Sequence, residues 1–461
     1  MVKVNFNGEM LFAQEGELLS TVLMQNGIPH AHPCGGRGVC KKCTVFVDGK
    51  EELSCRYTVE KDITVSASKD EIKSFAETEQ TAQLSRESCY VLDIGTTTLA
   101  LALVSLDKKE IIRAVTRINP QCAYGADVIS RIDYCRKNSF EPLQKVLINE
   151  LNSMAMELGG IKAERLYAAG NTTMLHLLLG ADPSPMGVAP YTPGFLKSVE
   201  IEGQKLGAEF VKTVITLPGI SAFVGADIVA GINLVGLPPE GKYCLLVDLG
   251  TNAEIVLLGR DKLLCASAAA GPCFEGANIE CGMPAQKGAV YAYSKGEYKT
   301  VGDAPARGIC GTGLVDIVSE LLGGEIDETG YMERERFYIT DIVYLSQADV
   351  RQFQLAKSAI YSALQVLIKF ADIEWESIET LYISGGFSAE LNPESAVRCG
   401  LIPIALKEKI VSLNNSSLHG ALKYATEQND LSEYTTKAQY IDLATNPDFT
   451  KSFMDNMLFK I

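Results

Sequence analysis

The sequence predicts a multidomain α/β protein, in which a small N-terminal module precedes a larger unit made of two related lobes. The chain has 461 residues, which exceeds the usual size of one hydrophobic core and favours two or more domains. Strand-like and helix-like apolar patterns alternate from Tyr90 onward, as they do in α/β folds. A strand–turn–strand pattern also occurs twice in this region, and this repetition predicts the two lobes.

The composition restricts the function. A net charge of −15 argues against nucleic acid or an anionic membrane as the partner. No apolar run reaches the roughly 20 residues that a membrane-spanning helix needs, and the first residues show no apolar stretch of a secretory signal. Thirteen cysteines, most of them scattered singly, indicate reduced thiols rather than a disulfide framework. We therefore expect a cytoplasmic protein, and its thiols favour an anaerobic host.

Residues 1–68 are expected to form a small mixed sheet of the β-grasp kind. Apolar and polar residues alternate over Val2–Phe6, as in a half-buried strand. A helix is expected over Leu18–Asn26, because Gly27 follows it as a stop signal. Asp48-Gly49 separates two apolar runs and predicts a hairpin turn.

The remaining chain divides into four segments. Residues 69–88 are polar and lack a clear period, so they are expected to form a linker. We expect lobe I over residues 89–243, lobe II over 244–430, and a C-terminal strand and helix segment over 431–461 that packs on the larger unit. The clearest helix is expected at Val350–Asp372, where apolar residues, Phe370 included, recur at three-to-four spacing.

Four cysteines in the N-terminal module form an iron–sulfur signature. Cys34, Cys40, Cys43 and Cys55 have the spacing C-x5-C-x2-C-x11-C, which is close to the C-x4-C-x2-C of plant-type 2Fe–2S ferredoxins. The loop Gly35–Gly38 contains three glycines, which allow backbone N–H groups to approach a cluster. Zinc is the alternative, but zinc sites usually show two short cysteine pairs and only one CxxC occurs here. The pattern therefore favours a 2Fe–2S cluster bound by all four thiolates.

The two repeated turns predict a polyphosphate site. Asp93-Ile94-Gly95-Thr96 and Asp248-Leu249-Gly250-Thr251 each follow an apolar strand. Amides and hydroxyls of such a turn can bind phosphate oxygens, and the aspartate can hold Mg²⁺ through water. The chain contains no G-x4-GK[ST] motif, which excludes a P-loop, and no GxGxxG follows a strand, which disfavours a dinucleotide fold.

On these motifs the larger unit resembles the actin, sugar-kinase and heat-shock chaperone ATPase superfamily, whose fold is actin-like (ribonuclease H-like). The resemblance implies that Asp93 and Asp248 begin two phosphate loops, that Leu381–Phe387 is an adenosine motif, and that Gly308–Leu314 opens a helix beside the nucleotide. The nucleotide-binding residues that it implies are Gly95, Thr96, Thr97, Thr98, Gly250, Thr251, Asn252, Gly311, Thr312, Gly313, Gly385 and Gly386.

Four carboxylates are the candidate catalytic residues. Asp93 and Asp248 are expected to position Mg²⁺ through water, and Glu254 or Glu275 is a candidate for orienting the attacking water. For both glutamates, a solvated or structural carboxylate is an equally good interpretation. Asn171-Thr172 is expected to contact phosphate or the partner.

Further motifs narrow the resemblance. Ala168–Met174, Val224–Asp227, Ala270–Ala277 and Ile441–Pro447 resemble segments of the reductive activators of corrinoid proteins. That family joins a 2Fe–2S ferredoxin domain to this ATPase fold, and the resemblance covers nearly the whole chain. Larger members carry linker and middle domains between the two parts, whereas only residues 69–88 are expected to lie between them here.

The resemblance implies ATP-dependent, one-electron reduction of Co(II) to Co(I) in a corrinoid protein of a methyltransferase system. It also implies an upstream electron donor of the ferredoxin or flavodoxin type, and it leaves open whether the chain forms a homodimer. One alternative is an activator of another low-potential enzyme, such as a radical acyl-CoA dehydratase, although those relatives lack a ferredoxin domain. A second alternative is a small-molecule kinase in which the cluster is a redox sensor.

Overall fold

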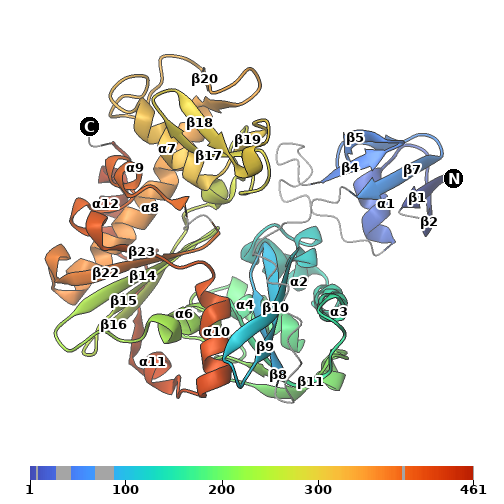
Figure 1. The fold of residues 1–461 in the computed structure, drawn as a ribbon, viewed down its shortest axis with the longest axis horizontal. Coiled ribbons are helices and arrows are strands. Elements are labelled where there is room, and N and C mark those ends of the chain that lie inside the picture. The colour runs from blue at the N-terminus through green and yellow to red at the C-terminus, as the bar shows by residue number, and fades with distance from the viewer. Residues whose placement is uncertain (7–8, 27–42, 68–87, 387–389, 460–461) are drawn as a thin grey trace. The chain divides into compact units, whose positions relative to one another are not determined.

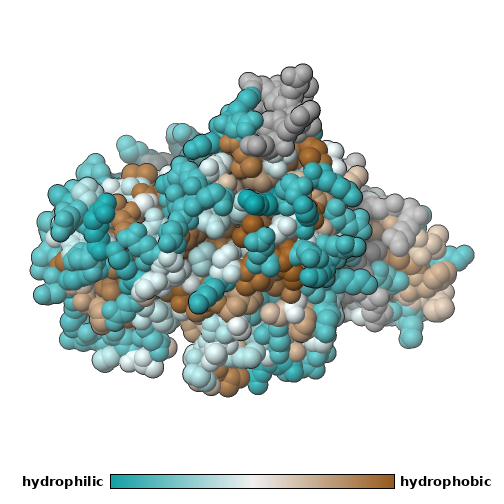
Figure 2. All heavy atoms as spheres, turned by 90° about the horizontal axis from the view of Figure 1, so that it is seen from below, coloured by the Kyte–Doolittle hydropathy of each residue, from teal (hydrophilic) through white to brown (hydrophobic). Residues whose placement is uncertain are grey.

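The structure is a computed structural model that describes residues 1–6, 9–26, 43–67, 88–386 and 390–459 (Figure 1). The chain forms two compact units, Met1–Thr216 and Leu217–Ile461. Almost all of the expected linker, together with Cys34 and Cys40, lies outside the described residues. In the part of the chain that the structure describes, no helix is long and apolar enough to cross a membrane. The face drawn in Figure 2 is largely covered by hydrophilic residues, and hydrophobic residues occupy smaller areas between them.

The N-terminal domain is a β-grasp, as predicted. Its sheet has the order β2-β1-β7-β4-β5, and helix α1 (Leu19–Gln25) contributes Leu19, Val22 and Leu23 to the domain's core. Asp48 and Gly49 form a two-residue turn in which both φ angles are positive, at 49° and 81°. This conformation suits Asp-Gly and matches the twist of a hairpin. The strands are β1 (Val2–Phe6), β2 (Glu9–Ala13), β3 (Glu17–Leu18), β4 (Thr44–Val47), β5 (Lys50–Leu53), β6 (Thr58–Val59) and β7 (Ile63–Ala67).

The rest of the first unit is built on a six-stranded sheet with the order β10-β9-β8-β11-β13-β12. Its strands are β8 (Ser88–Ile94), β9 (Thr98–Ser105), β10 (Glu110–Ile118), β11 (Ala163–Gly170), β12 (Glu200–Glu202) and β13 (Val211–Thr216). Its helices are η1 (Pro120–Ala123), α2 (Val128–Lys137), α3 (Glu141–Glu157), α4 (Thr172–Leu179), η2 (Ser184–Gly187) and α5 (Gly203–Leu206). Polar caps start three of these helices: Asn119 caps η1, Asp127 forms a capping box with Ser130 at α2, and Asn171 caps α4.

The second unit contains another six-stranded sheet, with the order β23-β22-β14-β15-β16-β24, and two smaller sheets, β18-β17-β19 and β20-β21. Its strands are β14 (Tyr243–Leu249), β15 (Ala253–Leu258), β16 (Leu263–Ala268), β17 (Ala289–Ser294), β18 (Glu297–Thr300), β19 (Gly308–Ile309), β20 (Arg336–Tyr338), β21 (Tyr344–Ser346), β22 (Ile378–Ser384), β23 (Ile410–Ser412) and β24 (Ala438–Tyr440). Its helices are α6 (Ala226–Val235), η3 (Pro272–Glu275), η4 (Val301–Asp303), α7 (Gly311–Leu321), α8 (Gln347–Ala371), η5 (Trp375–Ser377), α9 (Pro393–Arg398), η7 (Ile404–Lys409), α10 (Ser416–Glu427), α11 (Ser432–Lys437) and α12 (Pro447–Asp455).

The repeat seen in the sequence is a structural repeat. Strands β8 and β9 form an antiparallel hairpin, and β14 and β15 form the equivalent hairpin in the second unit. In each unit a parallel strand, β11 or β22, lies next to the first hairpin strand. Ile94 pairs with Leu99, whereas Leu249 pairs with Ala253, so the second loop is one residue shorter than the first.

Helix α8 confirms the clearest expected helix. Phe353, Ile360 and Leu364 are buried in the core, whereas Phe370, near the end of the helix, is 51% exposed. The buried face of the helix therefore does not include every apolar residue of the pattern.

Helix α6 belongs to the second unit, although the sequence analysis placed residues 217–243 in lobe I. It packs closely against α10 (Figure 1). A Cβ atom on Gly420 of α10 would lie 1.9 Å from the Ala230 carbonyl oxygen, and Asn233 donates to the Gly420 carbonyl at 3.1 Å. The two helices thus touch backbone to backbone, which only glycine permits at this position.

Candidate functional site

Two of the four predicted cluster ligands lie together. Cys43 directly precedes β4, Cys55 follows β5, both side chains are buried, and their Sγ atoms are 3.1 Å apart. A tetrahedral ion with metal–sulfur bonds of about 2.3 Å holds two thiolates roughly 3.8 Å apart. A small outward movement of the sulfurs would therefore let both bind one iron ion. Cys34 and Cys40 remain predictions, because they lie outside the described residues.

The surroundings of this thiol pair fit an iron–sulfur cluster. Burial, followed by the hydrogen bond with Cys55, raises the pKa of Cys43 to about 11. A cation would replace these protons, since the thiolate is the form that binds metal. Ser54 lies between β5 and Cys55, is fully buried, and its hydroxyl has no hydrogen-bond partner among the described residues. A buried hydroxyl without a partner is costly, and a thiolate or sulfide beside it would supply an acceptor.

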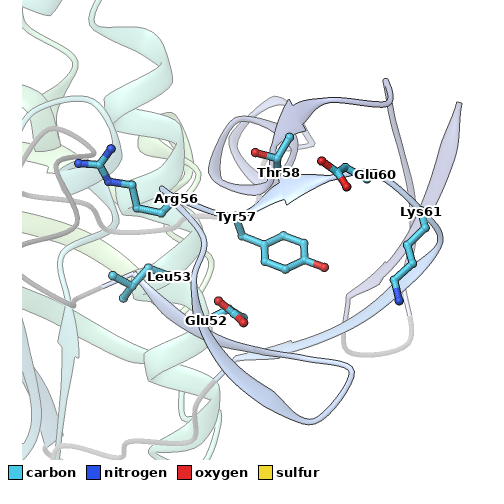
Figure 3. A pocket seen from close by; sticks show the side chains of 7 residues that line it. All are labelled: Glu52, Leu53, Arg56, Tyr57, Thr58, Glu60 and Lys61. Atoms are coloured by element: carbon cyan, nitrogen blue, oxygen red, sulfur yellow. The ribbon is translucent and has the colours of Figure 1, made fainter.

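A surface hollow of about 640 Å³ is lined by residues that precede and follow Cys55 in the chain (Figure 3). Tyr57 lies in the middle of the view, with Glu52 on one side and Lys61 at the far end. Partial burial, helped by the negative charges of Asp48, Glu52 and Glu60, raises the pKa of Tyr57. The hollow is lined by Glu52, Leu53, Arg56, Tyr57, Thr58, Glu60 and Lys61. Its acidic and basic side chains are mixed, so its charge selects neither a cationic nor an anionic ligand.

The first predicted phosphate loop, residues 95–98, joins β8 to β9. The Gly95 N–H donates to the Thr98 carbonyl at 2.9 Å and closes the turn. Asn119 donates from its side chain to the Gly95 carbonyl at 2.8 Å and from its backbone to the Thr97 carbonyl at 2.9 Å. Gly95 and Thr96 are half-buried and Thr98 is exposed, so the loop is held from the protein side while its other side reaches solvent.

Asn171 lies against this loop, and its expected contact with phosphate or the partner stays a prediction. Its side-chain amide donates to the Thr96 hydroxyl at 3.1 Å, and its oxygen caps α4 by accepting from the Met174 N–H at 3.0 Å. Gly170 ends β11 opposite Ile94, and a Cβ atom there would lie 2.8 Å from the Ile94 carbonyl oxygen. The glycine lets the end of β11 approach the loop. Thr172 is buried in the first turn of α4.

The second loop, residues 250–252, brings several predicted residues together. The Gly250 N–H donates to the Asn252 carbonyl at 2.9 Å. The Thr251 hydroxyl donates to the Glu275 carboxylate at 2.7 Å. Gly385 follows β22 with a φ of +107°, and a Cβ atom on it would lie 2.2 Å from the Leu249 carbonyl oxygen. The predicted adenosine motif therefore begins beside the second loop, and Gly386 next to it is exposed with open space around it.

Glu254 is a strongly perturbed carboxylate in the second hairpin. It pairs with Asp248 across the hairpin and accepts from the Ser267 hydroxyl at 3.0 Å. Burial, together with the negative charges of Asp227 and Asp248, raises the pKa of Glu254 well above its usual range. These interactions favour the protonated form of Glu254. The equivalent position of the first hairpin, opposite Asp93, is Ala100.

Asp227 is a site residue that the sequence reasoning missed. It lies in the first turn of α6, where a negative charge is favourable, and it acts electrostatically on Glu254. In the sequence, Asp227 belongs to the segment Val224–Asp227, which resembles the family but indicates no chemical role for the aspartate. The second unit therefore gathers Asp227, Asp248 and Glu254 in one acidic region.

The segment Gly308–Leu314 opens helix α7, as predicted. The contacts that the structure shows for Gly311, Thr312 and Gly313 are packing contacts with neighbouring backbone. Thr312 is buried and its hydroxyl donates to the Tyr291 carbonyl at 2.8 Å. Cβ atoms on Gly311 and Gly313 would lie 2.3 and 2.1 Å from the carbonyl oxygens of Phe274 and Val290. Both glycines thus let α7 pack against neighbouring backbone, and their role in nucleotide binding stays a prediction.

Comparison with known proteins covers nearly the whole chain. Residues 1–70 match a 2Fe–2S iron–sulfur cluster binding domain, residues 89–239 match the RACo middle region, and residues 242–461 match the C-terminal domain of RACo, described as the ASKHA domain. The middle-region match corrects the expectation that this chain lacks such a region, because residues 89–239 are that region.

Individual relatives agree with these matches. The corrinoid activation enzyme RamQ of Eubacterium limosum is 27% identical over 98% of each chain. A Methanosarcina barkeri protein, the [Co(II) methylated amine-specific corrinoid protein] reductase, is 27% identical over 79% of this chain and 75% of its own. The solved structure of a reductive activator for a corrinoid, iron–sulfur protein has a TM-score of 0.74 and 26% identity, and covers 100% of this chain and 98% of that one.

The fold and the matches define an iron–sulfur enzyme in which a 2Fe–2S domain is joined to an ATPase of the actin, sugar-kinase and heat-shock chaperone class. Within that class, the chain belongs to the RACo family of reductive activators.

Proposed function

We propose that this chain uses ATP to drive the one-electron reduction of a corrinoid protein from Co(II) to Co(I) in a methyl-transfer system. The observation that carries this proposal is the joining of a buried thiol pair in a 2Fe–2S domain to two phosphate-type loops in one chain. The curated relatives that match nearly all or most of the chain carry names that refer to this reaction.

The energetics explain why a nucleotide is needed. Each 59 mV that an electron must move uphill costs a factor of ten in its equilibrium, about 1.4 kcal/mol. A plant-type ferredoxin has a potential near −400 mV, so a target at much lower potential receives few electrons without help. ATP shifts this equilibrium through linkage. The protein has different affinities for the corrinoid partner in its ATP-bound and ADP-bound states, and this difference in affinity supplies the free energy for the electron transfer.

The residues have separate roles in this proposal. Cys34, Cys40, Cys43 and Cys55 hold the cluster, which stores and passes single electrons from an upstream carrier of the ferredoxin or flavodoxin type. The loops at residues 95–98 and 250–252 bind the phosphates of ATP, and Asp93 and Asp248 hold Mg²⁺ through water. The protein works in the cytoplasm, where thiols stay reduced.

The two candidate glutamates differ in what they can do. The Glu275 carboxylate accepts a hydrogen bond from the Thr251 hydroxyl at 2.7 Å. Glu275 therefore helps to hold the conformation of the second loop. Glu254 lies beside Asp248, and burial together with the negative charges of Asp227 and Asp248 raises its pKa, which makes its carboxylate a stronger base than an exposed glutamate. We therefore assign the orientation of the attacking water to Glu254.

The function is tested by anaerobic reconstitution. The protein with its cluster, ATP, Mg²⁺ and a reductant is mixed with a cob(II)alamin-loaded corrinoid protein from a methyltransferase system, and the Co(I) absorption band is recorded. We expect the band with ATP and no band with a non-hydrolysable analogue. ATP hydrolysis without Co(I) from any corrinoid partner would refute the activator assignment, and a phosphorylated small molecule would favour a kinase.

A further inference from the structure

A fully buried arginine lies behind the first phosphate loop. Arg131 of α2 has no exposed surface. Its guanidinium donates to the Thr96 carbonyl at 2.5 Å, to the Gly125 carbonyl at 3.0 Å and to the Gln121 side-chain oxygen at 3.3 Å. It also donates to the sulfur atoms of Met174 at 3.1 Å and Cys122 at 3.3 Å. The three oxygen acceptors are uncharged, and the first belongs to the central peptide of the loop.

The charge of Arg131 is not neutralised by an ion pair. No carboxylate among the described residues is within ion-pair distance of it. Cys122, followed by Asp127, acts on it electrostatically, and the Asp127 carboxylate accepts the Ser130 N–H at 2.7 Å as the cap of α2. Burial lowers the pKa of Arg131, but a guanidinium stays charged in proteins. A buried charge without an opposite charge is strongly unfavourable, which suggests that an anion completes its surroundings.

Arg131 and Asn119 together hold three successive carbonyl groups of the loop from the protein interior. Asn119, which is also fully buried, holds those of Gly95 and Thr97, and Arg131 holds that of Thr96. These hydrogen bonds fix the loop before a ligand binds, so the loop does not need to change its conformation on binding. The positive charge of Arg131 thus contacts a loop whose residues are half-buried or exposed.

We propose that Arg131 is a positioning residue for the phosphates of the nucleotide. It orients the Thr96 peptide by hydrogen bonding, and its buried charge attracts the phosphate anion across that peptide, where low polarity strengthens the interaction. The phosphates in turn supply the opposite charge that Arg131 lacks. This inference rests on the proposed binding of ATP to this loop, and it assigns a role to a residue 35 positions away from Thr96.

The test compares ligands that differ in phosphate number. Dissociation constants of ATP, ADP and adenosine are measured with Mg²⁺ for the full chain and for Arg131→Met, Arg131→Lys and Arg113→Met. Arg113 is the matched control, because it lies in the same lobe and donates instead to the Leu158 carbonyl. For Arg131→Met we expect ATP binding to weaken about tenfold or more, ADP binding to weaken less, and adenosine binding to stay within about twofold. Arg131→Lys restores part of the ATP affinity because it keeps the charge.

The outcomes separate the inference from the proposed function. If Arg131→Met loses affinity equally for ATP and adenosine, the role of Arg131 is purely structural and the inference is overturned. Unchanged ATP affinity in this variant would also overturn it. If Arg131→Met does not fold, Arg131→Lys decides: a selective loss for ATP of up to about fivefold supports the role, and equal losses for all three ligands overturn it. A wild-type chain that binds no ATP would remove the proposed function and this inference together.

Discussion

At the scale of single residues, Ser54 offers a direct test of the cluster site. Its buried hydroxyl has no partner among the described residues and lies beside Cys55. Hydrogen bonds to cluster sulfurs are one of the factors that set the reduction potential. Because the reduced cluster is the more negative form, a donor to it stabilises reduction.

We predict that Ser54→Ala lowers the midpoint potential of the cluster by roughly 20–60 mV, since one hydrogen bond contributes about 0.5–1.5 kcal/mol. A redox titration followed by electron paramagnetic resonance measures the shift. Ser66→Ala is the control, because Ser66 is exposed on β7. An unchanged potential in Ser54→Ala would show that the hydroxyl does not reach the cluster.

A second residue-scale prediction concerns His176. Its Nδ1 lies 2.7 Å from the Thr172 carbonyl and its Nε2 accepts the Gly194 N–H at 2.9 Å, so the proton is on Nδ1. Burial lowers the pKa of His176 below the ordinary 6.5. Below that pH the unfolded chain binds a proton that the folded chain excludes, so stability falls as the pH falls.

We therefore expect the free energy of unfolding to fall more steeply between pH 7.5 and 5.5 in the wild type than in His176→Gln. The two slopes should differ by up to about 1.4 kcal/mol per pH unit. Urea denaturation at a series of pH values measures this difference. His419→Gln, in the second unit, is the control for loss of a histidine. Identical slopes in wild type and His176→Gln would contradict the prediction.

Sequence patterns located those site residues that are close together in the chain. The four cysteines and the two Asp-x-Gly-Thr turns are local motifs, so their spacing reports their chemistry directly. The pairing of Thr251 with Glu275 and the support of Thr96 by Arg131 cross 24 and 35 residues. Such contacts depend on how strands and helices pack, and no local pattern carries them.

At the scale of elements, the contact between α6 and α10 is the tightest helix packing in the described part of the second unit. We predict that Gly420→Ala lowers the free energy of unfolding by about 1–3 kcal/mol or more, because the new methyl group would overlap the Ala230 carbonyl. Thermal denaturation of the purified variant measures the loss. Gly324→Ala is the control, since the nearest atom to its Cβ would be 3.8 Å away; equal stability of both variants would refute the close contact.

Individual helices and hairpins were predictable where one face of the element is buried and the other is exposed. The hairpin at Asp48-Gly49, both Asp-x-Gly-Thr hairpins and helix α8 all followed from period and turn chemistry. The packing partner of helix α6 was not predicted, because Gly420 of α10 is 187 residues from Asn233 in the chain. The apolar residues of α6 do not identify the helix against which they pack.

At the scale of the whole molecule, the proposal requires that the cluster and the nucleotide site act as separable parts. We predict that Asp93→Asn reduces ATP turnover and ATP-dependent Co(I) formation at least tenfold, because the amide no longer carries the charge that holds Mg²⁺. Its cluster absorption spectrum should match the wild type.

The reciprocal variant completes this test. Cys55→Ser should lose the cluster spectrum and Co(I) formation while basal ATP hydrolysis continues. Loss of the cluster spectrum in Asp93→Asn, or loss of basal hydrolysis in Cys55→Ser, would show that the parts do not function independently.

The two hairpins differ at one position in a way that matters for their history. Where the second hairpin has Glu254 opposite its aspartate, the first has Ala100. Two copies that had stayed alike would each place a glutamate across the hairpin from the aspartate of the turn. The duplicated architecture has instead become asymmetric, with two carboxylates facing each other across the second hairpin and a carboxylate facing a methyl group across the first.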